Sequence, residues 1–189
     1  MLSQIGLFLL DVLLLPFTGI VLLRFHAVWM NVPMRNPIGE FIMSLTDIAV
    51  LPLRRNLPTF GKFDLASFIV AFALAWLYLL AALWFKGYPF ETFPGVALLL
   101  WTALQLARLS LYLLMAGLLL QAVLSWTNPH SPLQPFIHAI TYRFVRPVQR
   151  IVPLAGSVDL SPLIVLLICQ LLLIVPIGPL EQQITQMLR

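Results

Sequence analysis

A block of about thirty residues occurs twice in this chain, and both copies lie between long apolar segments. Residues 36–65 and 131–160 share eleven identical positions at a constant offset of 95 residues. The shared positions form a pattern of proline, arginine, glycine and aspartate: Pro52, Arg55, Pro58, Gly61 and Asp64 in the first copy, and Pro147, Arg150, Pro153, Gly156 and Asp159 in the second. Just upstream the copies match again at an offset of 97, in Trp29 and Asn31 against Trp126 and Asn128. An internal repeat of this kind indicates one supersecondary unit that is used twice.

The composition indicates that lipid is part of the solvent of this chain. Hydrophobic residues make up 61% of the 189 residues and charged residues 10%, whereas soluble domains have about 45–50% and about 25%. A helix needs about twenty apolar residues to cross roughly 30 Å of hydrocarbon. Four runs meet this requirement: Ile5–Val28, Leu65–Phe85, Val96–Trp126 and Leu160–Ile177. We therefore predict an all-α membrane protein with four transmembrane helices, arranged as two parallel helix–amphipathic helix–helix repeats.

Each duplicated block begins with a helix-start signal, Asn36-Pro37 in one copy and Ser131-Pro132 in the other. Apolar residues then follow at the spacing of one helical face: Ile38, Phe41, Ile42, Leu45 and Ala49, and Leu133, Phe136, Ile137, Ile140 and Phe144. These stretches are too short to span a bilayer. An amphipathic helix at the interface is the favoured interpretation, and a segment that dips partway into the membrane is the alternative.

The prolines of the motif predict where each amphipathic helix stops, because proline costs a hydrogen bond and clashes with the preceding turn. The chain then passes the glycine and reaches Asp64 or Asp159, which we expect to cap the next span. One hypothesis is structural and pairs Arg55 with Asp64 and Arg150 with Asp159. The other is functional, a surface for anionic lipid headgroups or a partner protein, built from Arg54, Arg55, Arg146 and Arg150.

The domain organisation follows from the repeat. We assign residues 1–86 to the first repeat, 87–95 to a linker and 96–189 to the second repeat, with a polar tail after Pro179 that leaves the membrane. Seven of the eleven Lys/Arg residues lie in the two inter-helix loops: Arg35, Arg54, Arg55, Lys62, Arg143, Arg146 and Arg150. The positive-inside rule then predicts cytoplasmic loops and both termini outside, with a pseudo-axis along the membrane normal.

Three ionisable residues fall inside the apolar runs, where a charge is costly and therefore marks a functional hypothesis. Asp11 and Arg108 are expected to pair across helices or to line a polar pathway. Arg24 lies near the end of its run, and we expect its side chain to extend to the headgroups.

Motifs of soluble enzymes are missing from the sequence: there is no HExxH, CxxC, phosphate-binding glycine loop or Gly-x-Ser-x-Gly. The single Cys169 excludes an internal disulfide. Although the net charge is +4, the basic residues do not form the cluster with interleaved aromatics that nucleic acid requires. We expect no enzymatic activity, no catalytic residue, no cofactor, no metal and no nucleic acid; the expected partners are the lipid bilayer, other membrane proteins or a second copy of the chain.

Three segments of the second copy resemble the YggT family, also called YlmG: Ser125–Pro132, Arg146–Pro153 and Gly156–Pro162. The resemblance extends over essentially the whole chain, although the first copy has Leu51 where the second has Arg146. It implies a small multi-pass protein of the bacterial inner membrane. Relatives in the family have been linked to osmotic stress and ion uptake, to cell-division gene clusters and, in plastids, to cytochrome assembly and nucleoid organisation.

Two functional hypotheses remain open from the sequence. The first is a non-enzymatic assembly or organising factor, linked to osmotic stress or cell division, that acts through its cytoplasmic amphipathic helices and arginines. The alternative is a subunit of an ion channel or transporter in osmotic adaptation, with Asp11 and Arg108 along a polar route.

Overall fold

The structure is a computed structural model that describes residues 1–55, 57, 63–90, 94–128, 130–152 and 159–188, except the side chain of Trp126. This part of the chain contains helices and no β-strand. In order they are α1 (Leu2–Leu9), the π-helical segment η1 (Leu10–Leu14), α2 (Leu15–Trp29), α3 (Pro37–Arg54), α4 (Leu65–Phe85), α5 (Gly95–Thr127), α6 (Gln134–Gln149), α7 (Ser161–Leu172), the π-helical segment η2 (Leu173–Ile177) and α8 (Gly178–Met187).

Four helical stretches are long and apolar enough to cross a membrane, which confirms the predicted fold class. They are Leu2–Trp29, formed by α1, η1 and α2; Leu65–Phe85, which is α4; Gly95–Ser125 in α5; and Ser161–Met187, formed by α7, η2 and α8. The sequence predicted a polar tail after Pro179 that leaves the membrane, but this segment is not a separate tail. The helix continues as α8, which packs alongside α5.

The first and the last span each continue past a proline, because each contains a π-helical turn. In the first span, η1 lies directly before Pro16, and the N–H of Leu15 donates to the carbonyl of Leu10. In the last span, Pro176 lies inside η2, and Gly178 donates to Leu173 in the same way. A single wide turn of this kind absorbs the disturbance in the hydrogen-bond ladder and lets the helix resume.

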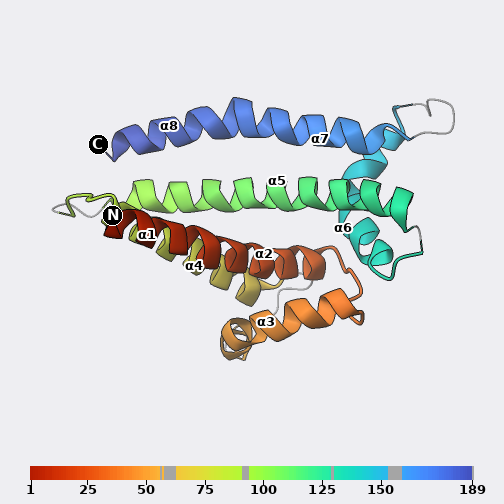
Figure 1. Cartoon of the computed structure of the whole chain (residues 1–189), viewed down its shortest axis with the longest axis horizontal. Coiled ribbons are helices and arrows are strands. Elements are labelled where there is room, and N and C mark those ends of the chain that lie inside the picture. Colours follow the sequence, from red (N-terminus) through yellow and green to blue (C-terminus); the bar gives the residue numbers. More distant parts are fainter. Residues whose placement is uncertain (56, 58–62, 91–93, 129, 153–158, 189) are drawn as a thin grey trace.

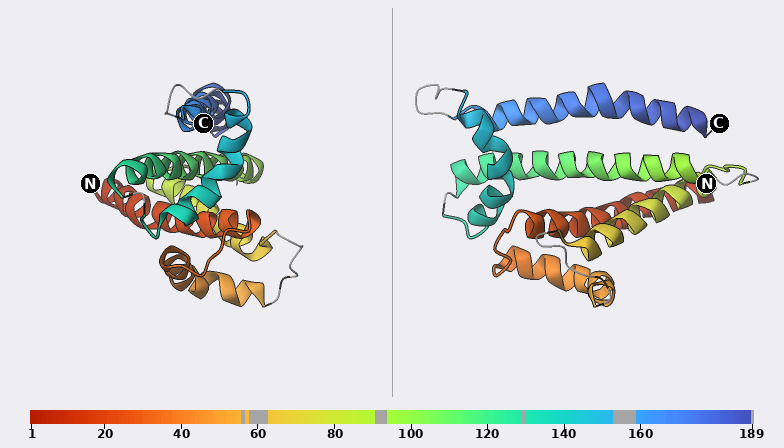
Figure 2. Two further views of the ribbon diagram at one scale, coloured as in Figure 1. Left: turned by 90° about the vertical axis from the view of Figure 1, so that its right-hand side faces the viewer. Right: turned by 180° about the vertical axis from the view of Figure 1, so that it is seen from behind.

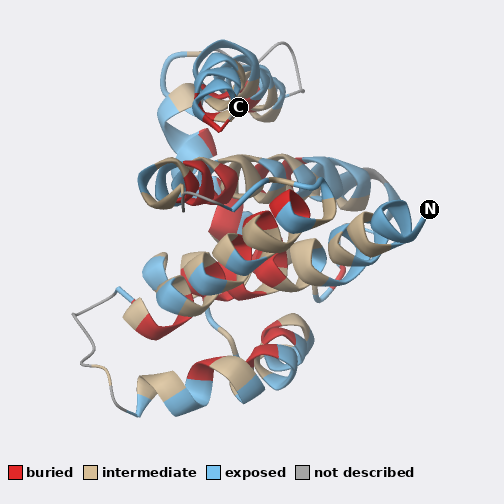
Figure 3. Cartoon of the chain, turned by 90° about the vertical axis from the view of Figure 1, so that its left-hand side faces the viewer, coloured by how far each residue is buried: buried red, intermediate tan, exposed pale blue. Residues whose placement is uncertain are grey.

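The duplicated order of long, short and long helix is visible in space (Figure 1). Both termini and the connection from α4 to α5 lie at one end of the bundle, whereas α3 and α6 lie at the other (Figure 2). The four helices α2, α3, α4 and α5 form the tighter part. The last span contacts α5 and α6 and leaves most of its surface exposed (Figure 3).

Small and apolar residues form the core between the spans. Ala71 and Ala75 of α4 are completely buried and pack with Val21 and Leu22 of α2. Small side chains of this kind let two helix backbones approach closely within a membrane. A second cluster joins the two amphipathic helices, because Ile42 of α3 packs with residues of α6 that include Phe136 and Ile137.

The two amphipathic helices begin differently. As predicted, α3 starts at Pro37, and the side chain of Asn36 accepts a hydrogen bond of 2.9 Å from the N–H of Gly39. In the second copy α6 starts only at Gln134. The Ser131 hydroxyl accepts from the N–H of Leu133 at 3.3 Å, so that serine closes a turn ahead of the helix and does not cap it.

The buried face of α3 is shifted along the sequence by one position from the predicted face, and the two share only Ile42. Its buried positions are Gly39, Ile42, Thr46 and Val50. By contrast, Phe41 is 60% exposed and Leu45 is 38% exposed. In α6 the buried set is Phe136, Ile137, Ile140, Thr141 and Val145. Both faces contain a completely buried threonine, a residue type that the apolar pattern does not include.

Each amphipathic helix ends two residues after the first proline of its motif. Pro52 lies inside α3, which ends at Arg54, and Pro147 lies inside α6, which ends at Gln149. A proline near the last turn removes little of the hydrogen-bond ladder, so the helix tolerates it there. The remaining predicted motif positions lie outside the described residues: Pro58, Gly61, Pro153 and Gly156.

Candidate functional site

At the end of α3, Arg54 contacts Asp64 at the start of α4. The Arg54 guanidinium donates to the carboxylate at 2.5 Å, and the Ser67 hydroxyl donates to the same oxygen at 2.6 Å. Asp64 is 4% exposed, and its carboxylate accepts no capping hydrogen bond from the backbone of α4. The predicted Arg55–Asp64 pair is therefore wrong: Arg54 makes the contact, and Arg55 is exposed. The last turn of α3 directs position 54 towards the next span.

The second copy repeats this contact with a neutral side chain. Gln149 donates to the Asp159 carboxylate at 2.7 Å, and the backbone N–H of Ser161 donates to its other oxygen at 2.9 Å. The N-cap residue of α7 is Leu160, which has no side-chain cap, so Asp159 bonds the first N–H of this helix from one residue further out than predicted. Arg150, its expected partner, is exposed. Hydrogen bonds from Ser161 and then Gln149 lower the pKa of Asp159. Positions 54 and 149 differ by the repeat offset of 95, so the two contacts are equivalent.

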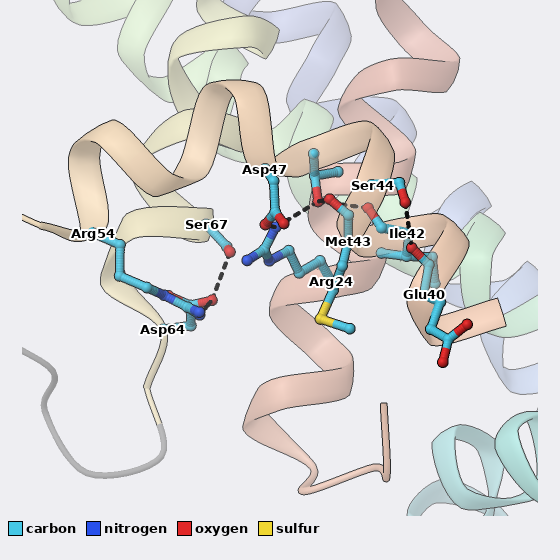
Figure 4. A network of polar contacts seen from close by, with 10 residues as sticks. Arg24, Glu40, Ile42, Met43, Ser44, Asp47, Arg54, Asp64 and Ser67 are labelled. Carbon is cyan, nitrogen blue, oxygen red and sulfur yellow. Dashed lines mark hydrogen bonds and ion pairs between the residues drawn. The ribbon is translucent and has the colours of Figure 1, made fainter. Parts of the chain in front are cut away.

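A second contact joins each amphipathic helix to the preceding span. Arg24 of α2 donates to the Thr46 hydroxyl and to the Asp47 carboxylate of α3, both at 2.7 Å (Figure 4). Arg24 is 2% exposed. The expectation that it extends to the headgroups is therefore wrong. The guanidinium is satisfied inside the protein, which is the less costly solution once α3 supplies two acceptors.

The corresponding contact in the second copy is again neutral. At the upstream offset of 97, Arg24 corresponds to Gln121, and at the offset of 95, Thr46 corresponds to Thr141. The Thr141 hydroxyl donates to the Gln121 side chain at 2.6 Å. Both repeats thus hold their amphipathic helix at two equivalent points, with arginine at both points in the first repeat and glutamine at both points in the second.

The arginines of the second repeat lie on the outer face of α6. Three of them are exposed, and none forms an ion pair with a residue that the structure describes: Arg143, Arg146 and Arg150. With Tyr142 and Pro147 they line a surface pocket of about 270 Å³, and we call these three residues the α6 arginine face. At the repeat offset, Arg143 and Arg146 replace the exposed Ile48 and Leu51 of α3.

Aromatic rings hold two of these guanidinium groups in place. Arg143 lies over the ring of Trp29 in α2, with 5.2 Å from the guanidinium carbon to the ring centroid. Arg146 lies over Tyr142, one turn earlier in α6, at 5.6 Å. A cation over an aromatic face is attracted by the ring and retains its charge. The face therefore presents ordered positive groups that can bind an anionic group bidentately.

Within the spans, the predicted Asp11–Arg108 pair does not form. The Asp11 carboxylate, in η1, accepts a hydrogen bond of 2.7 Å from the Tyr78 hydroxyl of α4. Arg108 of α5 pairs with Glu181 of α8 through both guanidinium nitrogens, and Trp101 donates to Glu181 at 3.4 Å. Because the last span continues past Pro179, it brings Glu181 within reach of Arg108.

Several of these contact residues were not among those proposed from the sequence: Thr46, Asp47, Tyr78, Trp101, Gln121, Thr141, Gln149, Ser161 and Glu181. For Gln121 and Thr141 a signal exists, because extending the offset of 97 back to Arg24 aligns them with the first-copy contact. For Glu181 no such signal exists in the repeat. Among the described residues, no group of three His, Cys, Asp or Glu side chains is placed to hold a metal ion.

Four long apolar helices and two short helices, in the order long, short, long in each half, define a polytopic helical membrane protein built from two repeats. The sequence profile of the family described as CCB3/YggT matches residues 3–85 and 100–180, close to the two repeats. The chain belongs to the CCB3/YggT family.

Relatives of this chain are found in several bacteria. It is 30% identical to "Uncharacterized protein YggT" of Escherichia coli K12, over 85% of this chain and 83% of the relative. It is 29% identical to a protein of Pseudomonas aeruginosa, over 90% and 87% of the two chains, and 31% identical to one of Vibrio alginolyticus, over 83% and 85%. No solved structure matches.

Proposed function

We propose that this protein is a non-enzymatic organising factor of the bacterial inner membrane, linked to osmotic stress or cell division, and that the α6 arginine face is its binding surface. The observation that carries this proposal is the asymmetry between the repeats. In the first repeat, Arg24 and Arg54 are used within the protein. In the second repeat, glutamines make the same contacts, and the arginines lie at exposed positions of α6, where they can bind an acidic partner segment or lipid phosphates.

In the proposed orientation α3 and α6 lie on the cytoplasmic side, and both termini lie outside. Two observations support it. Seven of the eleven Lys/Arg residues belong to the two inter-helix segments, and the bundle brings α3 and α6 to the same end (Figure 1). Short loops rich in Lys and Arg remain in the cytoplasm.

The test removes two arginines of the face and compares crosslinking in native membranes. In the variant Arg146→Ala/Arg150→Ala we expect normal membrane insertion and at least about a tenfold loss of proteins crosslinked to the chain, since a charged hydrogen bond contributes about 1.5–3 kcal/mol. The matched control, Arg35→Ala/Arg55→Ala, removes two exposed arginines of the first repeat and should leave the crosslinks unchanged. Equal crosslinking of the two variants contradicts the proposal.

A second candidate function is ion transport in an oligomer, and one observation favours it. Asp11 lies inside the first span, is exposed on the surface of a single copy, and has a hydroxyl as its hydrogen-bond partner. A carboxylate in such a place is costly unless water or a second chain meets it. In liposomes the purified protein should then conduct ions, and Asp11→Asn should change the flux. Flux equal to that of empty vesicles excludes this function.

A further inference from the structure

An apolar crevice runs along the seam between the two repeats, where α2 lies beside α5. It consists of two adjacent cavities, of about 330 Å³ and about 100 Å³, which share Leu23 and Leu113 in their walls. The larger extends towards Leu15 and Tyr112, and the smaller reaches His26 and Phe144 beneath α6. The crevice therefore leads from the middle of the spans to the end of the bundle where the α6 arginine face lies.

Gly19 keeps this crevice open. It is buried and lies inside α2, where glycine costs about 1 kcal/mol relative to alanine. A Cβ added at Gly19 would nevertheless meet no atom within 4 Å. Gly19 is therefore buried, but its missing side chain would point into free space, so this residue forms the bottom of a narrow slot. The absence of a side chain here leaves room for a slender apolar group.

The inner end of the crevice is next to a positive charge. His26 lines the crevice, and its ring contacts the ring of Trp29, with 6.4 Å between centroids. The guanidinium carbon of Arg143 in turn lies over the ring of Trp29, at 5.2 Å from the ring centroid. Trp29 and Arg143 do not line the cavities themselves but follow His26 in this series of contacts. An apolar slot with a tryptophan and an arginine beyond one end has the polarity of a phospholipid at the membrane interface.

The length of the crevice fits one leaflet. Helix α2 rises about 15 Å between Gly19 and Trp29, at 1.5 Å per residue. This rise is half of the roughly 30 Å of hydrocarbon in a bilayer. An acyl chain of one leaflet that starts beside Trp29 therefore ends near Gly19.

We propose that the chain binds an anionic phospholipid at this seam, with one acyl chain in the crevice between α2 and α5 and the phosphate on Arg143. The proposal rests on the proposed function in that it uses the α6 arginine face. It adds the ligand class and an acyl-chain site that involves both repeats.

The experiment compares two lipid probes with identical diazirine-bearing acyl chains, one phosphatidylglycerol and one phosphatidylcholine, in phosphatidylcholine liposomes that contain the full chain. Mass spectrometry maps the crosslinked residues. At residues 15–30 and 109–116 we expect the anionic probe to label about fivefold more than the neutral one, the ratio that one arginine near the headgroup provides.

Two variants test the two parts of the site. Gly19→Phe fills the crevice and should abolish labelling by the anionic probe at these residues. Its control, Ala73→Phe, fills the apolar groove between α3 and α4 that is lined by residues such as Ala49 and Ile69, and should leave labelling unchanged. Arg143→Gln, at an exposed position, should make the two probes label equally, whereas Arg55→Gln should not.

Equal labelling by the two probes in the unmodified protein, or labelling that persists in Gly19→Phe, overturns the proposal. If the probes label equally but Arg146→Ala/Arg150→Ala still loses its crosslinked proteins, the lipid site fails and the proposed function stands. If the anionic probe labels preferentially but the crosslinked proteins are unchanged, the lipid site stands and the proposed function fails.

Discussion

The two repeats hold the same short helix at the same two points, but they use their charges in opposite ways. In the first repeat the contacts are Arg24 with Thr46 and Asp47, and Arg54 with Asp64. In the second repeat the equivalent residues are Gln121 with Thr141 and Gln149 with Asp159. Both repeats retain the hydrogen-bonded contacts, but a neutral glutamine in the second repeat takes the place of each charged arginine in the first.

This exchange changes what the outer face of each helix can do. On α3 that face includes Ile48, which is 81% exposed, and at the same repeat position α6 has Arg143. Arg55 and Arg150 are exposed in both repeats, but only the second repeat has two further arginines, Arg143 and Arg146, on the outer face of its short helix. A duplicated unit can therefore keep one fold while one copy presents a more strongly charged surface than the other.

The contrast is expected to be largest at the contact between the short helix and the following span. Arg54→Ala leaves the Asp64 side chain, 2% exposed, with the Ser67 hydroxyl as its hydrogen-bond donor. We expect the free energy of unfolding to fall by about 3 kcal/mol, because an unpaired buried charge is strongly destabilising. The equivalent Gln149→Ala should lower it by less than about 0.5 kcal/mol, since Asp159 is exposed to water. Unfolding by sodium dodecyl sulfate in mixed micelles measures both, and equal losses would contradict the comparison.

Breaking the contact between Arg24 and Asp47 should lower the free energy of unfolding by less, and a second substitution should restore part of the loss. Asp47→Asn leaves the buried Arg24 without its carboxylate, and we expect a loss of about 2 kcal/mol. Asp47 is partly exposed, at 38%, which keeps the loss below that at Asp64. Adding Arg24→Gln to this variant reproduces the neutral pairing of the second repeat and should restore about half of the loss. A double variant less stable than Asp47→Asn would show that the first repeat cannot accept the neutral contact.

Removing the neutral contact of the second repeat should cost less again. Thr141→Val keeps the shape of the side chain and removes the hydrogen bond to Gln121. The expected loss is about 1 kcal/mol, the net contribution of an ordinary hydrogen bond. The same unfolding assay measures it, and Thr127→Val, which removes an exposed hydroxyl of α5, is the control. A loss as large as that of Asp47→Asn would remove the energetic difference between the repeats.

The smallest expected effect is the pH dependence at Asp159. The pKa of Asp159 is lowered in the folded state from an ordinary value of 3.8, so its stabilising contribution is present above pH 3.8. It is lost as the pH falls through the lower folded-state value. The stability difference between the unmodified protein and Asp159→Asn should therefore begin to shrink as the pH falls towards 3.8 and should continue to shrink below it, in unfolding measured between pH 3 and pH 6. A difference that grows on acidification would have the wrong sign.

Much of the fold was predictable because apolar length and the repeat are strong signals. The four spans, the two short helices and the cap at Asn36 all follow from local patterns. The end of the last span was not predictable, because the polar residues after Pro179 are typical of a segment that follows a transmembrane helix. It is held as a helix by a long-range contact, Glu181 with Arg108.

The candidate site was less predictable, and the reason lies in which residue of each pair makes the contact. The two repeats share an arginine at Arg55 and Arg150, and each was expected to pair with the aspartate of its own repeat. The aspartates are instead contacted by the preceding residues, Arg54 and Gln149, which differ between the repeats. The orientation of a side chain in the last turn of a helix depends on how far that helix continues past its proline. The sequence does not fix this distance, and one residue of error moves the contact to its neighbour.

The most direct test of the division between the repeats is cysteine labelling at equivalent positions of α3 and α6. In a Cys169→Ala background, Ile48→Cys and Arg143→Cys are labelled from each side of the membrane with a charged maleimide and, separately, with a lipid-soluble one. We expect both sites to react from the same side, and the charged reagent to label position 143 much faster than position 48. Labelling from opposite sides, or equal rates with the charged reagent, would contradict it.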